Sequence, residues 1–216
     1  MRIMTLPGVF APISDSWMLA DAIRSENLRP GSRALDICTG SGLLALTAAE
    51  CGADTTAIDV SRRALLTVRL NALRAGVRVR TLQGRTFGPV AAERFDLIVS
   101  NPPYVPSLRP GVPRFGACRA WEAGHDGRIV LDVLCDGAAA HLRPGGALLV
   151  VHSSLIGIDA TVQRLQYAGL VNVGVQACER GLLGPLMRAQ QVAGTIPAGV
   201  EEEDVVIIRA SAPASG

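Results

Sequence analysis

The chain has 216 residues, a length that suits one α/β domain with a sizeable buried core. Its 21 basic and 19 acidic side chains leave a formal charge of +2, whereas nucleic-acid binders usually concentrate positive charge. Apolar residues make up 49% of the chain, but charged residues interrupt every apolar run before the roughly 18 residues of a membrane span. Composition therefore excludes a membrane protein and argues against a nucleic-acid-binding surface.

Cysteine usage and the N-terminus both indicate an intracellular chain. Five cysteines are scattered without any CxxC pair. An odd and unpatterned set is typical of reduced thiols and predicts neither a disulfide framework nor a metal site. The N-terminal stretch MRIMTLPGVFAPISDS has no basic region followed by an apolar one, so we predict no signal peptide and a cytoplasmic location.

Short apolar runs alternate with helical patterns, which predicts one doubly wound α/β domain over residues 1–216. We expect an N-terminal helix segment within residues 1–30, a core over residues 31–211 and a frayed tail over residues 212–216. The expected strands are 33–38, 55–60, 78–83, 95–100, 147–152, 171–177 and 204–209. The expected helices between them are 41–51, 61–75, 128–141 and 158–168.

Two stretches break this alternation. Residues 102–127 are rich in Pro and Gly without a helical period, and residues 180–203 are irregular and lead into the acidic run 201–204. Long irregular stretches in compact domains are usually lids or binding segments. The acidic run by itself indicates a solvated loop face.

A glycine-rich turn follows the first strand, in the stretch LDICTGSG. Gly40 and Gly42 let the backbone approach a ligand closely, and the helix that follows offers unpaired N–H groups to an anionic group. Many such turns only pack a helix against a strand, so this turn alone does not decide between the two roles.

The second strand ends in AIDVS, which places Asp59 and Val60 about twenty residues after the glycine turn. An acid at that place can accept both hydroxyls of a ribose, although it can equally cap the helix that begins near Ser61. Together the two motifs favour an adenosyl cofactor, with NAD and S-adenosylmethionine both still open.

The fourth strand runs into the NPPY motif, residues 101–104, at the sheet edge that also carries the glycine turn. Two prolines fix the backbone and remove two N–H donors. The Asn101 side-chain carbonyl and the Pro102 carbonyl can then hold both hydrogens of an NH₂ group, and Tyr104 offers a flat face to a planar amide or base. Such a clamp aims the nitrogen lone pair at a methyl group and favours the charge that develops on nitrogen. The motif therefore predicts N-methylation.

Three segments, LDICTGSG, AIDVS and FDLIVSNPPYV, carry a family resemblance. They resemble the class I S-adenosylmethionine-dependent methyltransferases with an NPPY motif. More narrowly, they are similar to the HemK-type protein-glutamine N5-methyltransferases, which modify the GGQ loop of translation release factors. The similarity extends to WEAGHDGRIVLDVL and to GVFAPISDSWMLADAI, where Asp15 and Ser16 match an acid and a hydroxyl residue ahead of the first helix.

The resemblance implies a Rossmann-like fold whose seven-stranded, mostly parallel sheet has one antiparallel strand, near residues 204–209. It also implies S-adenosylmethionine as the cofactor, no metal, and a protein substrate such as a release factor. The implied catalytic residues are Asn101, Pro102 and Tyr104, and the implied substrate-binding residues are Asp15, Pro103 and Tyr104. The implied cofactor-binding residues are Asp36, Cys38, Gly40, Gly42, Asp59, Val60 and Asn101.

The chain departs from the family pattern in several ways. Cys38 stands where the family usually has glycine, and Arg85 stands where the family tends to carry an acid for the adenine amino group. The resemblance covers about residues 9–158, so we expect a form without the N-terminal helical domain of the bacterial enzymes, similar to the short eukaryotic and archaeal branch. Members of that branch act with a small zinc-binding activator protein, which makes such a protein a candidate partner.

Three other functions stay open. NPPY also serves exocyclic amines of RNA or DNA bases, where the base is extruded and stacked on an aromatic side chain. A small-molecule N-methyltransferase would use the two irregular stretches as a private pocket. A cofactor-binding protein without catalytic activity is consistent with the changes at Cys38 and Arg85.

Overall fold

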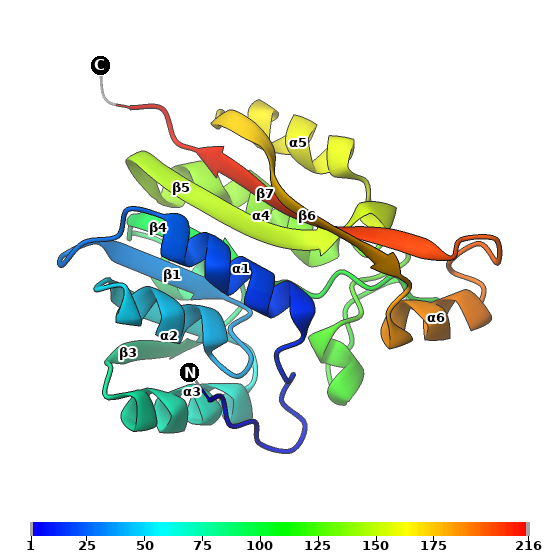
Figure 1. Cartoon of the computed structure of the whole chain (residues 1–216), viewed down its shortest axis with the longest axis horizontal. Helices are drawn as coiled ribbons and strands as arrows, with labels where there is room; N and C mark the ends of the chain where they lie inside the picture. Colours follow the sequence, from blue (N-terminus) through cyan, green and yellow to red (C-terminus); the bar gives the residue numbers. More distant parts are fainter. Residues whose placement is uncertain (1, 215–216) are drawn as a thin grey trace.

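The computed structural model describes residues 2–214. A seven-stranded sheet runs through the middle of the molecule, with helices on both of its faces (Figure 1). The strands are β1 (Arg33–Ile37), β2 (Asp54–Asp59), β3 (Val79–Gln83), β4 (Phe95–Ser100), β5 (Leu142–Ser153), β6 (Val171–Leu182) and β7 (Glu202–Ser211). The α-helices are α1 (Ser14–Ser25), α2 (Leu43–Glu50), α3 (Arg62–Ala75), α4 (Ile129–His141), α5 (Ile158–Tyr167) and α6 (Pro185–Val192).

The order of the strands determines where a ligand can bind. It is β3-β2-β1-β4-β5-β7-β6, with parallel pairs from β3 to β5 and with β7 antiparallel to both β5 and β6. The predicted seven-stranded Rossmann-like sheet with one antiparallel strand is thereby confirmed. The order reverses between β1 and β4, and open α/β sheets bind ligands outside the carboxyl ends of their strands at such a reversal.

The helices pack on the sheet as the apolar pattern predicts. Helices α1, α2 and α3 cover one face, and α4 and α5 cover the other (Figure 1). Strand β4 shows why its sequence is almost continuously apolar: Leu97 and Val99 pack toward α1 and α2, whereas Ile98 packs toward α4. Each of the four helices predicted within the core begins and ends within two residues of its expected bounds.

The C-terminal part corrects two expectations. Residues 180–203 are not wholly irregular, because β6 extends to Leu182 and α6 follows, starting at Pro185, where a missing N–H removes no helical hydrogen bond. The acidic run is not fully solvated either, since Glu203 is buried and its carboxylate accepts a hydrogen bond from the Gly184 N–H at 3.1 Å.

The predicted frayed tail, residues 212–216, does not begin at residue 212. Ala212 is buried, and its N–H donates to the Gly146 carbonyl at 2.8 Å, which continues the pairing of β7 beyond Ser211. Residues 215 and 216 of the tail lie outside the described residues.

Over residues 2–214, no helix is long and apolar enough to cross a bilayer. All five cysteines, which lie within the range, are free thiols. In the same range no group of three or more His, Cys, Asp or Glu side chains is arranged to hold a metal ion.

Candidate active site

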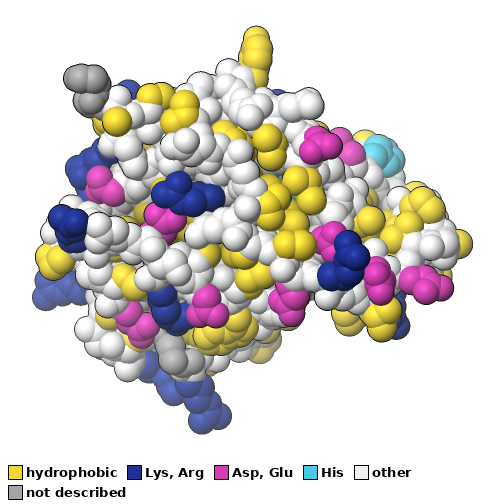
Figure 2. All heavy atoms as spheres, turned by 45° about the horizontal axis from the view of Figure 1, so that its top comes forward, with side chains coloured by type: hydrophobic (Ala, Val, Ile, Leu, Met, Phe, Trp, Pro, Cys, Tyr) yellow, Lys and Arg dark blue, Asp and Glu magenta, His cyan; other side chains and the backbone are white. Residues whose placement is uncertain are grey.

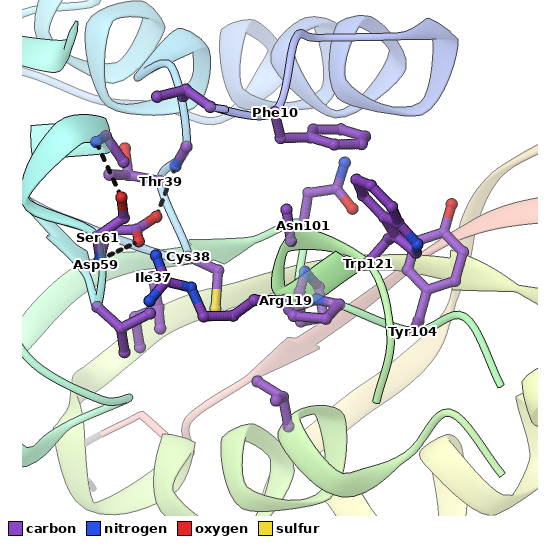
Figure 3. Close-up of a pocket in the computed structure, with 18 of the residues that line it drawn as sticks. Phe10, Ile37, Cys38, Thr39, Asp59, Ser61, Asn101, Tyr104, Arg119 and Trp121 are labelled. Carbon is purple, nitrogen blue, oxygen red and sulfur yellow. Dashed lines mark hydrogen bonds between the residues drawn. The ribbon is translucent and has the colours of Figure 1, made fainter. Parts of the chain in front are cut away.

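A pocket of about 270 Å³ opens at the carboxyl ends of β1, β2 and β4. The register explains why these ends meet: Ile37, the last residue of β1, pairs with Ile58 on one side and with Ser100 on the other. The glycine turn after β1, the end of β2 and the NPPY motif after β4 therefore all reach one cavity. Figure 3 shows Asp59 at one end of this cavity and Asn101 near the other.

The glycine turn is held from behind by Asp36, a fully buried residue of β1. One oxygen of its carboxylate accepts hydrogen bonds from the Thr39 hydroxyl at 2.5 Å and from the Ala45 N–H at 3.0 Å. Burial is the main reason why the pKa of Asp36 is raised to about 7. Asp36 thus ties the turn to the first residues of α2, and it does not itself line the pocket.

Gly42 also acts from behind the pocket wall. Its φ is +91°, and a Cβ at this position would lie 2.9 Å from the Val68 side chain of α3. A glycine here lets α2 turn away from β1 and pack closely on α3. Of the predicted cofactor-binding residues, Asp36 and Gly42 therefore shape the turn, whereas Cys38, Gly40, Asp59, Val60 and Asn101 line the cavity.

Cys38, which stands where the family usually has glycine, adopts a left-handed conformation with φ +62°. A side chain in this conformation costs roughly 1–2 kcal/mol, so the fold retains a strained residue at the wall of the pocket. Burial raises the pKa of the Cys38 thiol, which therefore stays protonated. The backbone shape that glycine usually provides is thus kept in this chain.

Asp59 joins the end of β2 to the glycine turn. Its two carboxylate oxygens accept hydrogen bonds from the Gly40 N–H at 3.0 Å and from the Ser61 N–H at 2.8 Å. Burial raises the pKa of Asp59, while these two hydrogen bonds and the charge of Arg119 act in the opposite direction. The N-cap of α3 is Ser61, whose hydroxyl accepts a hydrogen bond from the Ala64 N–H, so Asp59 is not the capping residue of this helix.

The NPPY end of the pocket is built from β4 and α1. The Asn101 side-chain N–H donates to the Ser16 hydroxyl at 3.0 Å, and the Tyr104 hydroxyl donates to the Asp15 carboxylate at 2.9 Å. Burial, and then the charge of Asp15, hold the pKa of Tyr104 well above its usual value. Asp15 and Ser16 lie within the first turn of α1, not ahead of the helix as the motif comparison implied.

The segment WEAGHDG supports the NPPY loop from outside. The Val105 N–H donates to the Trp121 carbonyl at 2.7 Å, and the Ala123 N–H donates to the Val105 carbonyl at 3.0 Å. Further along, Gly127 has φ +72°, and a Cβ there would lie 2.3 Å from the Tyr104 carbonyl oxygen. The backbone of this segment therefore lies directly against the backbone of the clamp.

Several residues that line the pocket were not predicted. Phe10 precedes α1, and Arg119 and Trp121 come from the Pro- and Gly-rich stretch, where Arg119 reaches across the cavity in Figure 3. The stretch was expected to be a lid or binding segment, but without a helical period nothing in it indicates which side chains turn inward. Arg85 lines the pocket as well, with an exposed side chain.

The residues present fit an adenosyl cofactor with an amino-acid tail. A Cβ at Gly40 would lie 3.7 Å from the Phe10 carbonyl oxygen, so a side chain there would fill the gap between the turn and the N-terminal segment. Each Asp59 oxygen accepts one described hydrogen bond and keeps a lone pair for a ribose hydroxyl. The cavity is continuous from this end to Asn101.

Residues 1–110 of the chain match the family model described as "Methyltransferase small domain". The chain belongs to this methyltransferase family. The resemblance drawn from the glycine turn, AIDVS and NPPY is thereby confirmed.

Curated relatives of this methyltransferase small-domain chain are named release factor glutamine methyltransferase. The relatives from Gloeobacter violaceus and Bordetella pertussis are 35% and 39% identical over 68% of this chain. The chain spans 55% and 57% of their lengths. A relative from Xylella fastidiosa strain 9a5c is 38% identical over 81% of this chain and is itself covered to 71%.

Solved methyltransferases share the fold. A methyltransferase from Pyrococcus furiosus superposes with a TM-score of 0.63 at 20% identity, over 98% of this chain and 88% of that protein. The Thermus thermophilus 16S rRNA N2 G1207 methyltransferase, solved with AdoMet and guanosine, superposes with a TM-score of 0.59 at 20% identity, over 97% of this chain and 47% of that protein.

Proposed function

We propose that this chain is an S-adenosylmethionine-dependent N-methyltransferase that methylates the side-chain amide of a glutamine in a protein, with a translation release factor as the substrate. The observation that carries the proposal is that Asn101 and Tyr104 line the same cavity as Asp59 and the glycine turn. The names of the curated relatives support both the reaction and the substrate. Because release factors act in translation, we also assign the activity to the cytoplasm.

The cofactor would occupy the end of the cavity formed by β1 and β2. Asp59 would accept the ribose hydroxyls, and the backbone around Gly40 would hold the amino-acid end, while Cys38 and Val60 contribute to the walls. When bound, S-adenosylmethionine supplies an electrophilic methyl group on a positively charged sulfur. Its presence would place this methyl group within the cavity that Asn101 also lines.

The substrate amide would be held by acceptors on the NPPY loop. The side-chain carbonyl of Asn101 and the backbone carbonyl of Pro102 would each accept one N–H of the glutamine NH₂ group, and Pro103 and Tyr104 would border the planar amide. Held in this way, the amide nitrogen would attack the methyl carbon, and the electron pair of the broken carbon–sulfur bond would remain on the leaving sulfur. One N–H proton would then pass to water, so this chain need not supply a general base at neutral pH.

The mixed surface charge argues against a nucleic-acid substrate. On the face shown in Figure 2, arginine and acidic side chains are interspersed, whereas RNA and DNA binding depends on concentrated positive charge. The relatives give no support for a zinc-binding activator. A protein without catalytic activity is disfavoured because the clamp and the Asp59 end are both intact.

Replacement of Asn101 tests the proposal. Asn101→Ala should leave the calorimetric affinity for S-adenosylmethionine within about twofold of the wild type, because Asp59 and the glycine turn are unchanged. Turnover should fall by about 100-fold or more, since an oxygen that faces the developing charge is lost. The assay is transfer of a tritiated methyl group to a purified bacterial release factor, with the modified glutamine identified by mass spectrometry.

Asn27→Ala is the matched control, because Asn27 is an exposed residue on the loop between α1 and β1. It should behave as the wild type in both measurements. Normal turnover by Asn101→Ala, or label found on RNA and not on protein, would contradict the proposed function.

A further inference from the structure

We propose that Asp15 and Ser16 are positioning residues, which fix the orientation of the Asn101 amide and of the Tyr104 ring. The inference rests on the proposed function, because it concerns how the same clamp is prepared for a substrate amide. It assigns to α1 the task of orienting two residues that follow β4. The sequence pattern implied only that Asp15 contacts the substrate.

A continuous chain of hydrogen bonds links the four residues. The Asn101 Nδ2 group donates to the Ser16 Oγ at 3.0 Å, and the Ser16 hydroxyl donates to the Asp15 Oδ1 at 3.0 Å. The Ser16 N–H donates to the same Oδ1 at 2.5 Å, and the Tyr104 hydroxyl donates to the Asp15 Oδ2 at 2.9 Å. Both carboxylate oxygens of Asp15 are therefore engaged within the fold.

The chemistry of these groups decides which end of the Asn101 amide points into the cavity. A carboxylate only accepts, so the single proton of the Ser16 hydroxyl is used in the bond to Asp15. The Ser16 oxygen can then only accept, which selects the NH₂ end of Asn101. If the amide were rotated, its carbonyl oxygen would face the Ser16 oxygen, and two acceptors would repel each other. Asn101 therefore keeps its carbonyl oxygen free for a substrate N–H.

The same carboxylate sets the aromatic part of the clamp. Tyr104 donates its hydroxyl proton to Asp15, which fixes the rotation of the side chain and the plane of the ring beside Asn101. Figure 3 shows the Tyr104 ring at the same end of the pocket as Asn101. One acid thereby orients the amide through Ser16 and orients the ring directly.

The base of this arrangement is rigid. Asp15 and Ser16 are only 3% and 5% exposed, and the next turns of α1 bury Leu19 and Ile23 completely against the sheet. Because α1 cannot shift without exposing these side chains, the two polar residues are held at a constant position under the loop. Asp15 accepts hydrogen bonds from Ser16 at one oxygen and from Tyr104 at the other, and through these two neighbours it acts on the substrate.

The orientation of the amide can be measured without catalysis. In the wild type, the two side-chain protons of Asn101 should give separate ¹H–¹⁵N signals that exchange slowly with water, assigned by their absence in Asn101→Asp. In Ser16→Ala this protection should be lost, because the acceptor is removed. Ser16→Thr keeps a hydroxyl and should restore it. Ser14→Ala, a change at the exposed first residue of the same helix, should leave both signals unchanged.

Kinetics with a release factor and S-adenosylmethionine give the second measurement. Ser16→Ala should lower kcat about tenfold, the order expected when one orienting hydrogen bond is lost. Its calorimetric affinity for the cofactor and its melting temperature should stay close to those of the wild type. Ser16→Thr should recover most of kcat, and Ser14→Ala should keep it all.

The outcomes separate the two proposals. If Asn101→Ala is inactive but Ser16→Ala keeps both full kcat and the protected Asn101 signals, the positioning role is wrong and the proposed function stands. If Asn101→Ala is fully active, the proposed function fails, and the Asn101 signals still decide whether Ser16 orients the amide. A loss of kcat in Ser16→Ala that Ser16→Thr does not restore would also overturn the positioning role.

Discussion

Replacing Gly127 by alanine should displace the NPPY loop, and the structure supplies a control for the backbone effect. Gly127 has φ +72°, and an added Cβ would lie 2.3 Å from the Tyr104 carbonyl oxygen and 2.9 Å from the Ile156 side chain. Gly76, at the end of α3, has φ +70° and no heavy atom within 4 Å of an added Cβ. The two substitutions thus share the conformational cost and differ in the collision.

The conformational cost sets the scale of the comparison. An alanine in the left-handed region loses roughly 1–2 kcal/mol, which for a domain of this size lowers the melting temperature by about 2–8 °C. Gly76→Ala should show this loss alone. In Gly127→Ala the Tyr104 carbonyl must also move from 2.3 Å to an ordinary contact of 3.4 Å or more, because a backbone atom cannot rotate away.

That movement should be visible in catalysis. A displacement of about 1 Å in a group that positions the substrate can reduce the rate by about 100-fold. Thermal unfolding and methyl transfer to a release factor are the assays, with calorimetry showing that affinity for S-adenosylmethionine is retained at the Asp59 end. The reasoning is refuted if Gly127→Ala loses no more stability than Gly76→Ala and also keeps wild-type turnover.

Two further predictions concern Asp59 and Asp36, the two acids that are hydrogen-bonded to the glycine turn or to the start of α2. Asp59→Ala should weaken the calorimetric affinity for S-adenosylmethionine by about 1–3 kcal/mol, because the ribose hydroxyls and the Gly40 N–H lose their acceptor. Unchanged affinity would show that Asp59 is not part of the cofactor site. Burial raises the pKa of Asp36 from 3.8 to about 7, so the folded state holds a proton that the unfolded state has lost between these values. Stability should therefore fall by up to about 4 kcal/mol as the pH rises from about 4 to 7, and then level off. Asp36→Asn should remove this slope in urea unfolding, and a slope that persists would contradict the assignment.

Local patterns were sufficient for most of the fold. Helix α3 could be placed because Ser61 and Gly76 flank an amphipathic stretch, and β4 because an almost continuous apolar run indicates a strand covered on both faces. Helix α6 was not predicted, because it has only eight residues and only two residues separate it from the end of β6. It is held to the fold by Met187, which is buried in the core cluster that also contains Leu131 and Leu165.

Part of the site could also be predicted from local patterns, and part of it could not. The motifs at the ends of β1, β2 and β4 could be expected to meet, because the carboxyl ends of neighbouring parallel strands lie at one edge of a sheet. Arg119 and Trp121 could not be expected, because the stretch that carries them has no period from which a direction follows. Both side chains line the cavity, and the segment 121–124 is hydrogen-bonded to Val105 and Ser107, which follow directly on NPPY.

The sequence alone was enough to predict the doubly wound sheet, the glycine turn with an acid after the next strand, and the NPPY motif at the same edge. Each of these features depends on residues that are close together in the chain. Only the tertiary structure decided which end of the Asn101 amide faces the cavity. Its partner Ser16 lies 85 residues away in the chain, and a side-chain amide has a donor end and an acceptor end that no local pattern distinguishes. The Ser16 hydroxyl on α1 determines this orientation, because it accepts a hydrogen bond from the NH₂ end of the amide.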